Sequence, residues 1–313
     1  MKSQHTAFLF PGQGSQSLGM GRELADIFPT AKETFKQGDE ILGFPLSQIA
    51  WNGPEEQLND TLNTQPALLV HSVATLRIFQ EHFPDFHPAF VAGHSMGELS
   101  ALVAAGALPF PEALGLVRRR GELMKQAGEA SPGGMAAVIG LDIPTLEEIC
   151  RQASLDGEMV QVANDNCPGQ VVISGNTEAL ERAMKMAGEA KALKVVRLAV
   201  SIAAHSPMMA HAQVEFNQAV DQAPITEPNI PLIGNVTAIP LVDAAAIRAD
   251  LKAQLTSRVR WTETIQHMLD QGIETFIELG SGEVLIGLVK RINRQVKRIS
   301  LGKPGDFDPL TDG

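Results

Sequence analysis

The feature that most constrains this chain is a serine between two glycines, where an apolar run meets a helix-like segment. The run is Phe90-Val-Ala-Gly-His-Ser95-Met-Gly, and residues 99–108 have the composition of a helix. Glycines two residues before and after a serine favour a sharp strand-to-helix turn that exposes the hydroxyl at a cleft. The next backbone N–H then lies at a helix N-terminus, where it stabilises developing negative charge. The pattern indicates a nucleophilic Ser95, with an ordinary glycine-rich turn as the alternative.

Composition narrows the class of protein. The 313 residues are 44% hydrophobic, with a formal net charge of -11, which suits one large or two modest domains. The acidic balance argues against general binding to nucleic acid or to anionic membranes. The two cysteines, Cys150 and Cys167, give no disulfide framework, and the histidines show no metal-ligand spacing. Without a signal-peptide core or a membrane-spanning run, we expect a cytoplasmic protein.

Strand-like and helix-like segments alternate, which predicts an α/β fold with a mainly parallel sheet. The segments predicted as core strands are 7–10, 90–93, 231–234 and 275–279. The segments predicted as helices include 21–38, 64–82, 111–127 and 207–223. Because the segment 64–82 is apolar around most of its circumference, we expect that helix inside the domain.

The middle of the chain departs from this alternation. Its segments follow the order strand, helix, strand, strand, helix, strand, at 135–140, 143–152, 159–163, 170–174, 177–190 and 193–198. That order is typical of a ferredoxin-like arrangement, and small residues at 130–134 mark its start. We therefore expect residues 129–199 to form an inserted ferredoxin-like subdomain. Residues 1–128 and 200–313 would form the larger core, with a ligand cleft between the two parts.

A nucleophilic serine needs a base, and His205 is the best candidate. It follows a strand-like segment and precedes a helix that begins at Pro207. Functional residues of α/β folds collect at strand ends, and an imidazole takes up and returns a proton near neutral pH. A capping or loop histidine is the alternative. His94 is interpreted as structural, because adjacent side chains on such a turn point apart.

One of three consecutive arginines lies on an apolar face of a predicted helix. Arg118 can pair with Glu122 one turn on, whereas Arg120 shares a face with Leu116 and Met124. An arginine on an apolar stripe is costly without a partner. The partner is either a substrate carboxylate, held in bidentate fashion, or an internal salt bridge.

Glycine-rich turns follow two further predicted strands. The segment Pro11-Gly-Gln13-Gly-Ser fits a dinucleotide fingerprint poorly, because Ser17 replaces its third glycine. A second oxyanion donor, the N–H of Gln13, is the better interpretation. The late segment Glu278-Leu-Gly-Ser-Gly is interpreted as a plain strand-to-helix turn.

Together these motifs resemble the malonyl-CoA:acyl-carrier-protein transacylase family and the acyltransferase domains of polyketide synthases. The resemblance covers nearly the whole chain, from 10–16 to 279–282. The matching stretches between these ends are 63–67, 93–98, 120–124, 164–175, 205–209 and 234–237. It implies an α/β-hydrolase-like core with an inserted ferredoxin-like subdomain, in agreement with the pattern of segments.

The resemblance also implies a role for each motif. Ser95 would attack the malonyl thioester with His205 as its base, Arg120 would bind the malonyl carboxylate, and the backbone carbonyl of Gln254 would orient the histidine. The oxyanion-hole and substrate-contacting positions are Gln13 and Met96, and Met124, Asn164 and Ala204. The implied reaction is ping-pong, from a coenzyme A thioester to Ser95 and then to the phosphopantetheine thiol of an acyl carrier protein. It uses no metal and no bound cofactor.

One position departs from the family pattern. Malonyl-selective polyketide acyltransferases tend to carry a bulky phenylalanine before the histidine, where this chain has Ala203-Ala204. The smaller side chain leaves room beside the acyl α-carbon, and removing such a wall shifts selectivity only modestly. We predict malonyl transfer with some methylmalonyl transfer.

An acidic carrier protein requires a local basic patch on this acidic chain. The densest positive cluster, called the basic cluster below, is Lys290, Arg291, Arg294, Lys297 and Arg298. We hypothesise that it contributes to carrier docking, with a solvated helix face as the alternative.

Three functions remain open from the sequence. The first is malonyl transfer in fatty acid biosynthesis. The second is a trans-acting polyketide synthase acyltransferase, or a related hydrolase that edits stalled acyl carriers. The third is a catalytically silent carrier-binding module. A monomer needs the fewest assumptions.

Overall fold

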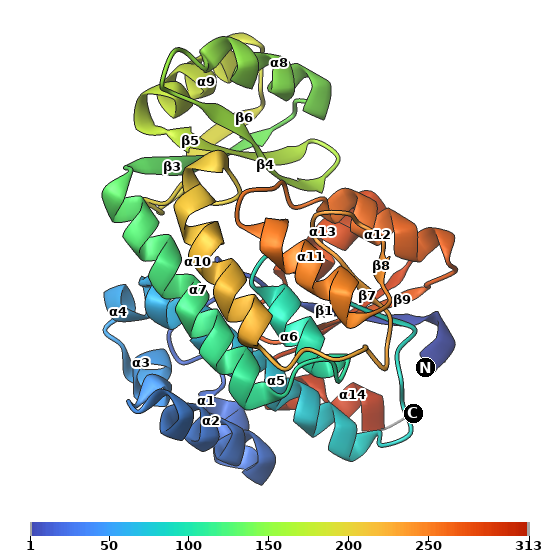
Figure 1. Cartoon of the computed structure of the whole chain (residues 1–313). Helices are drawn as coiled ribbons and strands as arrows, with labels where there is room; N and C mark the ends of the chain where they lie inside the picture. Colours follow the sequence, from blue (N-terminus) through green and yellow to red (C-terminus); the bar gives the residue numbers. More distant parts are fainter. Residues whose placement is uncertain (1, 312–313) are drawn as a thin grey trace.

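The computed structural model describes residues 2–311, with two separate sheets and helices around them (Figure 1). The strands of the larger sheet are β1 (Thr6–Phe10), β2 (Phe90–Gly93), β7 (Leu232–Ile233), β8 (Pro240–Leu241), β9 (Thr275–Leu279) and β10 (Lys297–Leu301). They lie in the order β10-β9-β1-β2-β7-β8, and every pair except β7–β8 is parallel. The predicted α/β class with a mainly parallel sheet is confirmed.

Twelve α-helices of the described residues lie outside the segment 133–197. They are α1 (Arg22–Ile27), α2 (Pro29–Leu42), α3 (Leu46–Asn52), α4 (Glu55–Asn59), α5 (Thr61–His82), α6 (Gly97–Ala104), α7 (Phe110–Ala130), α10 (Ala210–Gln222), α11 (Ala244–Gln254), α12 (Trp261–Asp270), α13 (Val284–Ile292) and α14 (Asp308–Thr311). Short 3-10 helices cover Ser3–His5, Pro207–Met209 and Pro304–Asp306.

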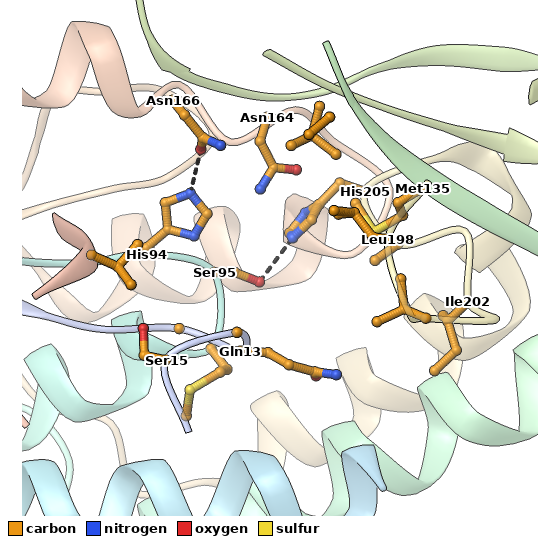
Figure 2. Close-up of a pocket in the computed structure, with 18 of the residues that line it drawn as sticks. Gln13, Ser15, His94, Ser95, Met135, Asn164, Asn166, Leu198, Ile202 and His205 are labelled. Atoms are coloured by element: carbon orange, nitrogen blue, oxygen red, sulfur yellow. Dashed lines mark hydrogen bonds between the residues drawn. The ribbon is translucent and has the colours of Figure 1, made fainter. Parts of the chain in front are cut away.

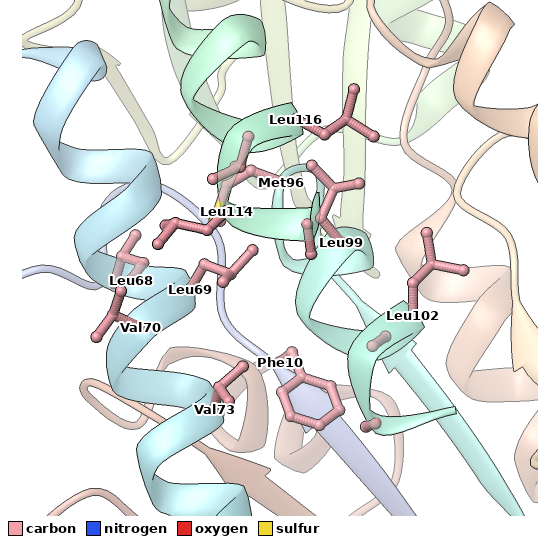
Figure 3. Packing of buried hydrophobic residues seen from close by; sticks show 14 of the residues in the cluster. Phe10, Leu68, Leu69, Val70, Val73, Met96, Leu99, Leu102, Leu114 and Leu116 are labelled. Carbon is pink, nitrogen blue, oxygen red and sulfur yellow. The ribbon is translucent and has the colours of Figure 1, made fainter. Parts of the chain in front are cut away.

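The central strands are buried on both faces, as is usual for a parallel sheet covered by helices. In β1, Phe8 and Phe10 pack in one apolar cluster, whereas Ala7 and Leu9 pack in another. The first cluster includes side chains of α5, α6 and α7, and Figure 3 shows several of them together with Phe10. Residues of α12 and α13 form the second. As expected, α5 is buried along most of its length.

One segment that was predicted as a single helix is divided into two helices in the structure. The segment 21–38 forms two helices, α1 and α2, because Phe28 adopts an extended conformation before Pro29. A proline disfavours the helical conformation of the residue that precedes it, and it fits the first turn of the next helix. The segment 207–223 likewise begins as the 3-10 helix Pro207–Met209 before α10.

The second sheet lies within the middle of the chain. Its elements are β3 (Gly133–Ile139), α8 (Ile143–Ala153), β4 (Val160–Cys167), β5 (Gln170–Asn176), α9 (Thr177–Glu189) and β6 (Lys194–Arg197). The antiparallel strand order is β4-β5-β3-β6, and α8 and α9 pack on the sheet through a core of their own. The predicted order of elements is confirmed. In Figure 1 this unit lies beyond the ends of α7 and α10.

Candidate active site

Ser95 lies on the turn between β2 and α6, at the carboxyl edge of the larger sheet. Its φ of 52° is in the left-handed region, which residues other than glycine seldom adopt. A Cβ on Gly93 would lie 2.0 Å from the carbonyl of Gly97, and one on Gly97 would lie 2.2 Å from the carbonyl oxygen of Phe10. Both glycines are required by these close approaches, which supports the predicted sharp turn.

His205 contacts Ser95 from the segment that follows β6. Its Nε2 lies 2.8 Å from Ser95 Oγ (Figure 2). Its Nδ1 lies 2.9 Å from the carbonyl oxygen of Gln254 and 3.1 Å from that of Ser257. Because carbonyl oxygens only accept hydrogen bonds, Nδ1 carries the proton and Nε2 is free to accept from the serine hydroxyl. The ring is thus held in the tautomer that a general base requires.

The protonation state of His205 is set by its surroundings. Burial, and then the positive charge of Arg120, lower the pKa of the imidazole to about 3. The hydrogen bonds to the carbonyls of Gln254 and Ser257 act in the opposite direction but are smaller effects. His205 is therefore neutral at physiological pH, the form that accepts a proton.

Arg120, on α7, is 1% exposed and lies beside the same hydroxyl. Its guanidinium donates to Gln65 Oε1 at 2.8 Å, to Gln254 Oε1 at 2.9 Å and to Ser95 Oγ at 3.0 Å. Burial lowers its pKa to about 10, so it remains a cation at neutral pH. None of these partners is a carboxylate, and Nε has no partner within residues 2–311. A buried cation without a paired anion has unmet capacity for a carboxylate.

A cavity of about 410 Å³ lies over Ser95 and takes its walls from both parts of the chain. Polar side chains line the part near the serine, including His94, Arg120 and His205. The apolar lining is supplied largely by β3, β5 and the segment after β6: Met135, Ala137, Val172, Leu198, Val200 and Ile202. This is the cleft that the sequence led us to expect, and its volume suits a small ligand.

The predicted oxyanion-hole residues, Gln13 and Met96, both line this cavity. Within the described chain, neither backbone N–H donates a hydrogen bond to another protein group. The side chain of Gln13 is held by the hydroxyl of Thr61, which donates to its Oε1 at 3.0 Å. Two unused N–H groups beside a nucleophile can bind an oxyanion.

The predicted substrate-contacting residues also line the cavity. The sulfur of Met124 accepts a hydrogen bond from Arg120 at 3.1 Å, so it packs on the guanidinium. Asn164 on β4 is buried, and its Oδ1 has no partner among the described residues. Ala204 lies beside the base. Such an unpaired acceptor suits a ligand that donates an N–H or O–H.

His94 was predicted to be structural, with its side chain directed apart from that of Ser95. It lines the same cavity as Ser95, and its Nε2 lies 2.8 Å from Asn166 Oδ1 (Figure 2). Its ring also packs edge-on against Trp261, and burial lowers its pKa. The cavity is wide enough at the turn to be lined by both neighbours. Its hydrogen bond and ring contact fit the predicted structural role.

The sequence did not single out four buried polar residues around the nucleophile, Gln65, Glu98, Asn235 and Asp250. Asn235 Oδ1 accepts the backbone N–H of Ser95 at 2.8 Å, and Gln254 Nε2 donates to Glu98 Oε2 at 2.6 Å. Gln65, Glu98 and Asn235 lie inside the stretches 63–67, 93–98 and 234–237. A polar residue at a helix position that is otherwise apolar was the available signal.

The late glycine-rich segment is a helix cap, in agreement with its interpretation as a plain turn. The buried carboxyl of Glu278 accepts backbone N–H groups of Leu285 at 3.1 Å and Ile286 at 2.9 Å. These bonds fix the start of α13, whose residues Val284, Leu285 and Leu288 line the cavity.

Two features of residues 2–311 bear on other functions. No group of three or more histidine, cysteine, aspartate or glutamate side chains is arranged to hold a metal ion. No helix in this part combines the length and the apolar character that crossing a membrane requires.

Comparison with known proteins gives the class first. The family model described as "Acyl transferase domain" matches residues 7–301, so the chain is an acyltransferase by family. Two curated relatives, both named malonyl CoA-acyl carrier protein transacylase, match at high identity. The Bacillus subtilis protein is 45% identical over 95% of this chain and 93% of its own length. The Haemophilus influenzae protein is 43% identical over 98% of each chain.

Solved structures narrow the class further. The malonyl CoA-acyl carrier protein transacylase of Coxiella burnetii is 42% identical, with a TM-score of 0.96 over 99% of this chain and 98% of its own. A malonyl-transacylase solved in complex with a type II polyketide acyl carrier protein is 39% identical, with a TM-score of 0.95 over 99% of both chains. The chain belongs to the malonyl-CoA:acyl-carrier-protein transacylase family, as its motifs had indicated.

Proposed function

We propose that this protein transfers the malonyl group from malonyl-CoA to the phosphopantetheine thiol of an acyl carrier protein. The observation that carries the proposal is the buried guanidinium of Arg120, which lies 3.0 Å from the hydroxyl of Ser95 and has no carboxylate partner within residues 2–311. A malonyl thioester presents a carboxylate and a reactive carbonyl that are separated by one methylene group. It can therefore satisfy the cation and meet the nucleophile at the same time.

The first half-reaction loads the serine. Nε2 of His205 takes the proton of Ser95 Oγ as the oxygen attacks the thioester carbonyl, and the N–H groups of Gln13 and Met96 stabilise the oxyanion. The C–S bond then breaks, and the imidazolium returns its proton to the leaving sulfur of coenzyme A. The product is a malonyl ester of Ser95 and a free thiol.

The second half-reaction reverses these steps with a different thiol. The phosphopantetheine thiol gives its proton to Nε2 of His205 and attacks the malonyl ester. When the C–O bond to Ser95 breaks, the imidazolium reprotonates Oγ and the site returns to its starting state. The carbonyls of Gln254 and Ser257 hold the ring throughout, replacing the acidic third member of other triads. The serine, the imidazole and the guanidinium supply all the groups this chemistry needs, so the proposal includes no bound cofactor.

The basic cluster supports the carrier as the partner. Four residues of the cluster are exposed at the end of α13, in the loop after it and at the start of β10: Lys290, Arg291, Arg294 and Lys297. Arg291 also donates a hydrogen bond to Gln170, which lines the cavity. Positive charge beside the cavity would attract an acidic carrier whose arm must enter it.

Intact-mass analysis tests the proposal directly. Incubation with malonyl-CoA should add one malonyl group to the wild-type protein, and addition of a phosphopantetheinylated carrier should remove it. Ser95→Ala should lack the adduct and lower kcat by about 10⁴- to 10⁶-fold, because nucleophile and base act as a unit. A malonyl adduct that persists in Ser95→Ala would falsify the assignment of the nucleophile.

A second candidate concerns the carrier rather than the chemistry. A relative of similar identity was solved with a polyketide acyl carrier protein, so a trans-acting role in polyketide synthesis stays open beside fatty acid synthesis. Charging of purified fatty acid and polyketide carriers at equal concentration separates the two. Hydrolytic editing predicts release of free malonate without a carrier and no product on the carrier.

Three further predictions belong with this function. We propose that residues 129–199 act as one inserted subdomain on a core formed by 1–128 and 200–313. We also propose a monomer in the cytoplasm, where its free cysteines, Cys150 and Cys167, stay reduced. Size-exclusion chromatography with light scattering tests the monomer, and cell fractionation tests the location.

A further inference from the structure

Beneath the catalytic pair lies a pair of buried carboxyl groups that the reaction does not use. Glu98 on α6 is fully buried, and Asp250 on α11 is 3% exposed. Asp250 lies beside Glu98, so that its negative charge and a side-chain hydrogen bond between the two carboxyl groups both raise the pKa of Glu98. Two carboxylate anions have no proton to donate, so one member of the pair must be protonated.

Asp250 is the better placed of the two to be the anion. Its Oδ1 accepts backbone N–H groups from Val236 at 3.3 Å and Thr237 at 3.4 Å, and also the Thr237 hydroxyl at 3.3 Å. No donor reaches Oε1 of Glu98 among the described residues. Burial, and then the negative charge of Asp250, raise the pKa of Glu98 well above its usual range. The cation Arg120 bonds to neither carboxyl.

The other carboxyl oxygen of Glu98, Oε2, determines how the side-chain amides of Gln254 and Asn235 are oriented. Oε2 accepts from Gln254 Nε2 at 2.6 Å and from Asn235 Nδ2. An acceptor at this point forces both amides to present their NH₂ groups to it. Their oxygens then face the site, where Asn235 Oδ1 accepts the N–H of Ser95 at 2.8 Å and Gln254 Oε1 accepts from Arg120 at 2.9 Å.

We propose that Glu98 is a positioning residue that works as an uncharged acid. Its protonated Oε1 donates to Asp250, and its Oε2 fixes the amides of Asn235 and Gln254, which hold the nucleophile and the guanidinium. Because Glu98 is uncharged, Arg120 has no internal counter-ion and stays available to the substrate carboxylate. This inference rests on the proposed function and adds how the same site is held in order.

The isosteric variant Glu98→Gln is the central test. An amide has one acceptor oxygen and one NH₂ group, which match Oε2 and the protonated Oε1. We expect kcat and KM for malonyl-CoA within about threefold of the wild type. Glu98→Ala removes the acceptor, and we expect kcat to fall about 10- to 100-fold, as when other residues that orient active groups are removed. If Glu98→Ala does not fold, the other variants still decide the question.

Asp250→Asn tests the charge. The new amide donates to Glu98 instead of repelling it, so the carboxyl of Glu98 ionises and acts as a counter-ion for Arg120. We expect KM for malonyl-CoA to rise about tenfold, with a smaller change in kcat, because the cation is then partly neutralised. A defect of folding alone would lower the yield of active enzyme without this selective rise in KM.

Glu278→Gln is the matched control for the chemical change. Both oxygens of Glu278 accept backbone N–H groups, so an amide there must turn its NH₂ group toward a donor. We expect the melting temperature to fall in Glu278→Gln and to stay near that of the wild type in Glu98→Gln.

The pH profile supplies a readout that packing alone does not move. The titratable and charged groups that interact with Glu98 are Asp250 and Arg120, whose pKa an ionised Glu98 would raise. If Glu98 is uncharged at the assay pH, Glu98→Gln leaves the acid limb of kcat/KM where it is. Activity as low in Glu98→Gln as in Glu98→Ala, a shifted acid limb, or an unchanged KM in Asp250→Asn would overturn the inference. A wild type that transfers no malonyl would instead overturn the proposed function.

Discussion

The two sheets contribute to the candidate active site in different ways. The larger sheet and its helices supply Ser95 and Arg120, and His205 reaches them from the segment after β6, so that Arg120 and His205 both lie within hydrogen-bond distance of Ser95 Oγ. The antiparallel sheet and the segment after it supply mainly apolar side chains of the cavity, such as Met135 and Leu198. Substitutions on the two sides should therefore change different properties, reactivity on one side and acyl selectivity on the other.

The largest effect that sharpens this comparison is expected for Arg120→Ala. Removal of the guanidinium leaves the malonyl carboxylate buried without a partner, so kcat/KM for malonyl-CoA should fall about 10²- to 10³-fold. Acetyl-CoA has no carboxylate, so kcat/KM for acetyl-CoA should rise relative to that for malonyl-CoA. Steady-state kinetics with both thioesters measure the change. The control is Arg118→Ala, whose side chain pairs with Glu122 as predicted, and intact malonyl transfer in Arg120→Ala would refute the clamp.

The pH dependence tests the same side of the site. The pKa of His205 is about 3, lowered by burial and then by Arg120, so the acid limb of kcat/KM should lie well below that of an exposed histidine. A bound carboxylate neutralises Arg120, so the acid limb of kcat should lie at higher pH than that of kcat/KM. Profiles of both parameters measure this difference, and coincident limbs would contradict it.

The same titration predicts a loss of stability in acid. The unfolded chain has the ordinary histidine pKa of 6.5, whereas the folded chain resists protonation down to about 3. Between these values the unfolded state binds the proton and the folded state does not. The free energy of unfolding should therefore fall as the pH is lowered through this window. Urea titrations of the wild type and of His205→Gln at several pH values measure how steeply the free energy of unfolding depends on pH in each protein.

A smaller effect is expected on the side of the antiparallel sheet. Leu198→Ala widens the apolar wall, so kcat/KM for methylmalonyl-CoA should rise about tenfold relative to that for malonyl-CoA. Loading of malonyl itself should change little, because no group that carries charge is removed. Leu193→Ala is the control, since that side chain is 82% exposed. Equal loss of malonyl and methylmalonyl transfer would contradict the division of reactivity and acyl selectivity between the two sides of the site.

The smallest effect is expected for the basic cluster. Charge reversal by Arg291→Glu with Arg294→Glu should raise KM for the carrier about fivefold and leave loading from malonyl-CoA unchanged, because exposed charges act on encounter. Lys32→Glu with Lys36→Glu on α2 is the charge-matched control. Unchanged carrier kinetics in the Arg291 and Arg294 variant would show that the cluster is only a solvated face.

Much of this arrangement could be predicted from the sequence. Alternation and glycine placement gave the strands at 90–93 and 275–279 and the order of elements in the middle segment. The convergence of Ser95, Arg120 and His205 came from motif order and from the resemblance. The break at Phe28 could have been predicted as well, because Pro29 follows it.

The polar residues that support the nucleophile could not be predicted in the same way. Glu98 and Asp250 lie 152 positions apart by number, and nothing in the sequence relates one acid to the other. Only the folded chain brings their two carboxyl groups together, where we propose that they share a proton.

The left-handed backbone at residue 95 restricts which nucleophiles this architecture can accept over evolution. A branch at Cβ crowds the main chain at positive φ, so threonine is disfavoured at that position although it carries the same hydroxyl. Cysteine has the shape of serine and meets no such barrier. The lineage is thereby confined to two unbranched side chains, and exchange between them turns an oxygen ester into a thioester on the protein.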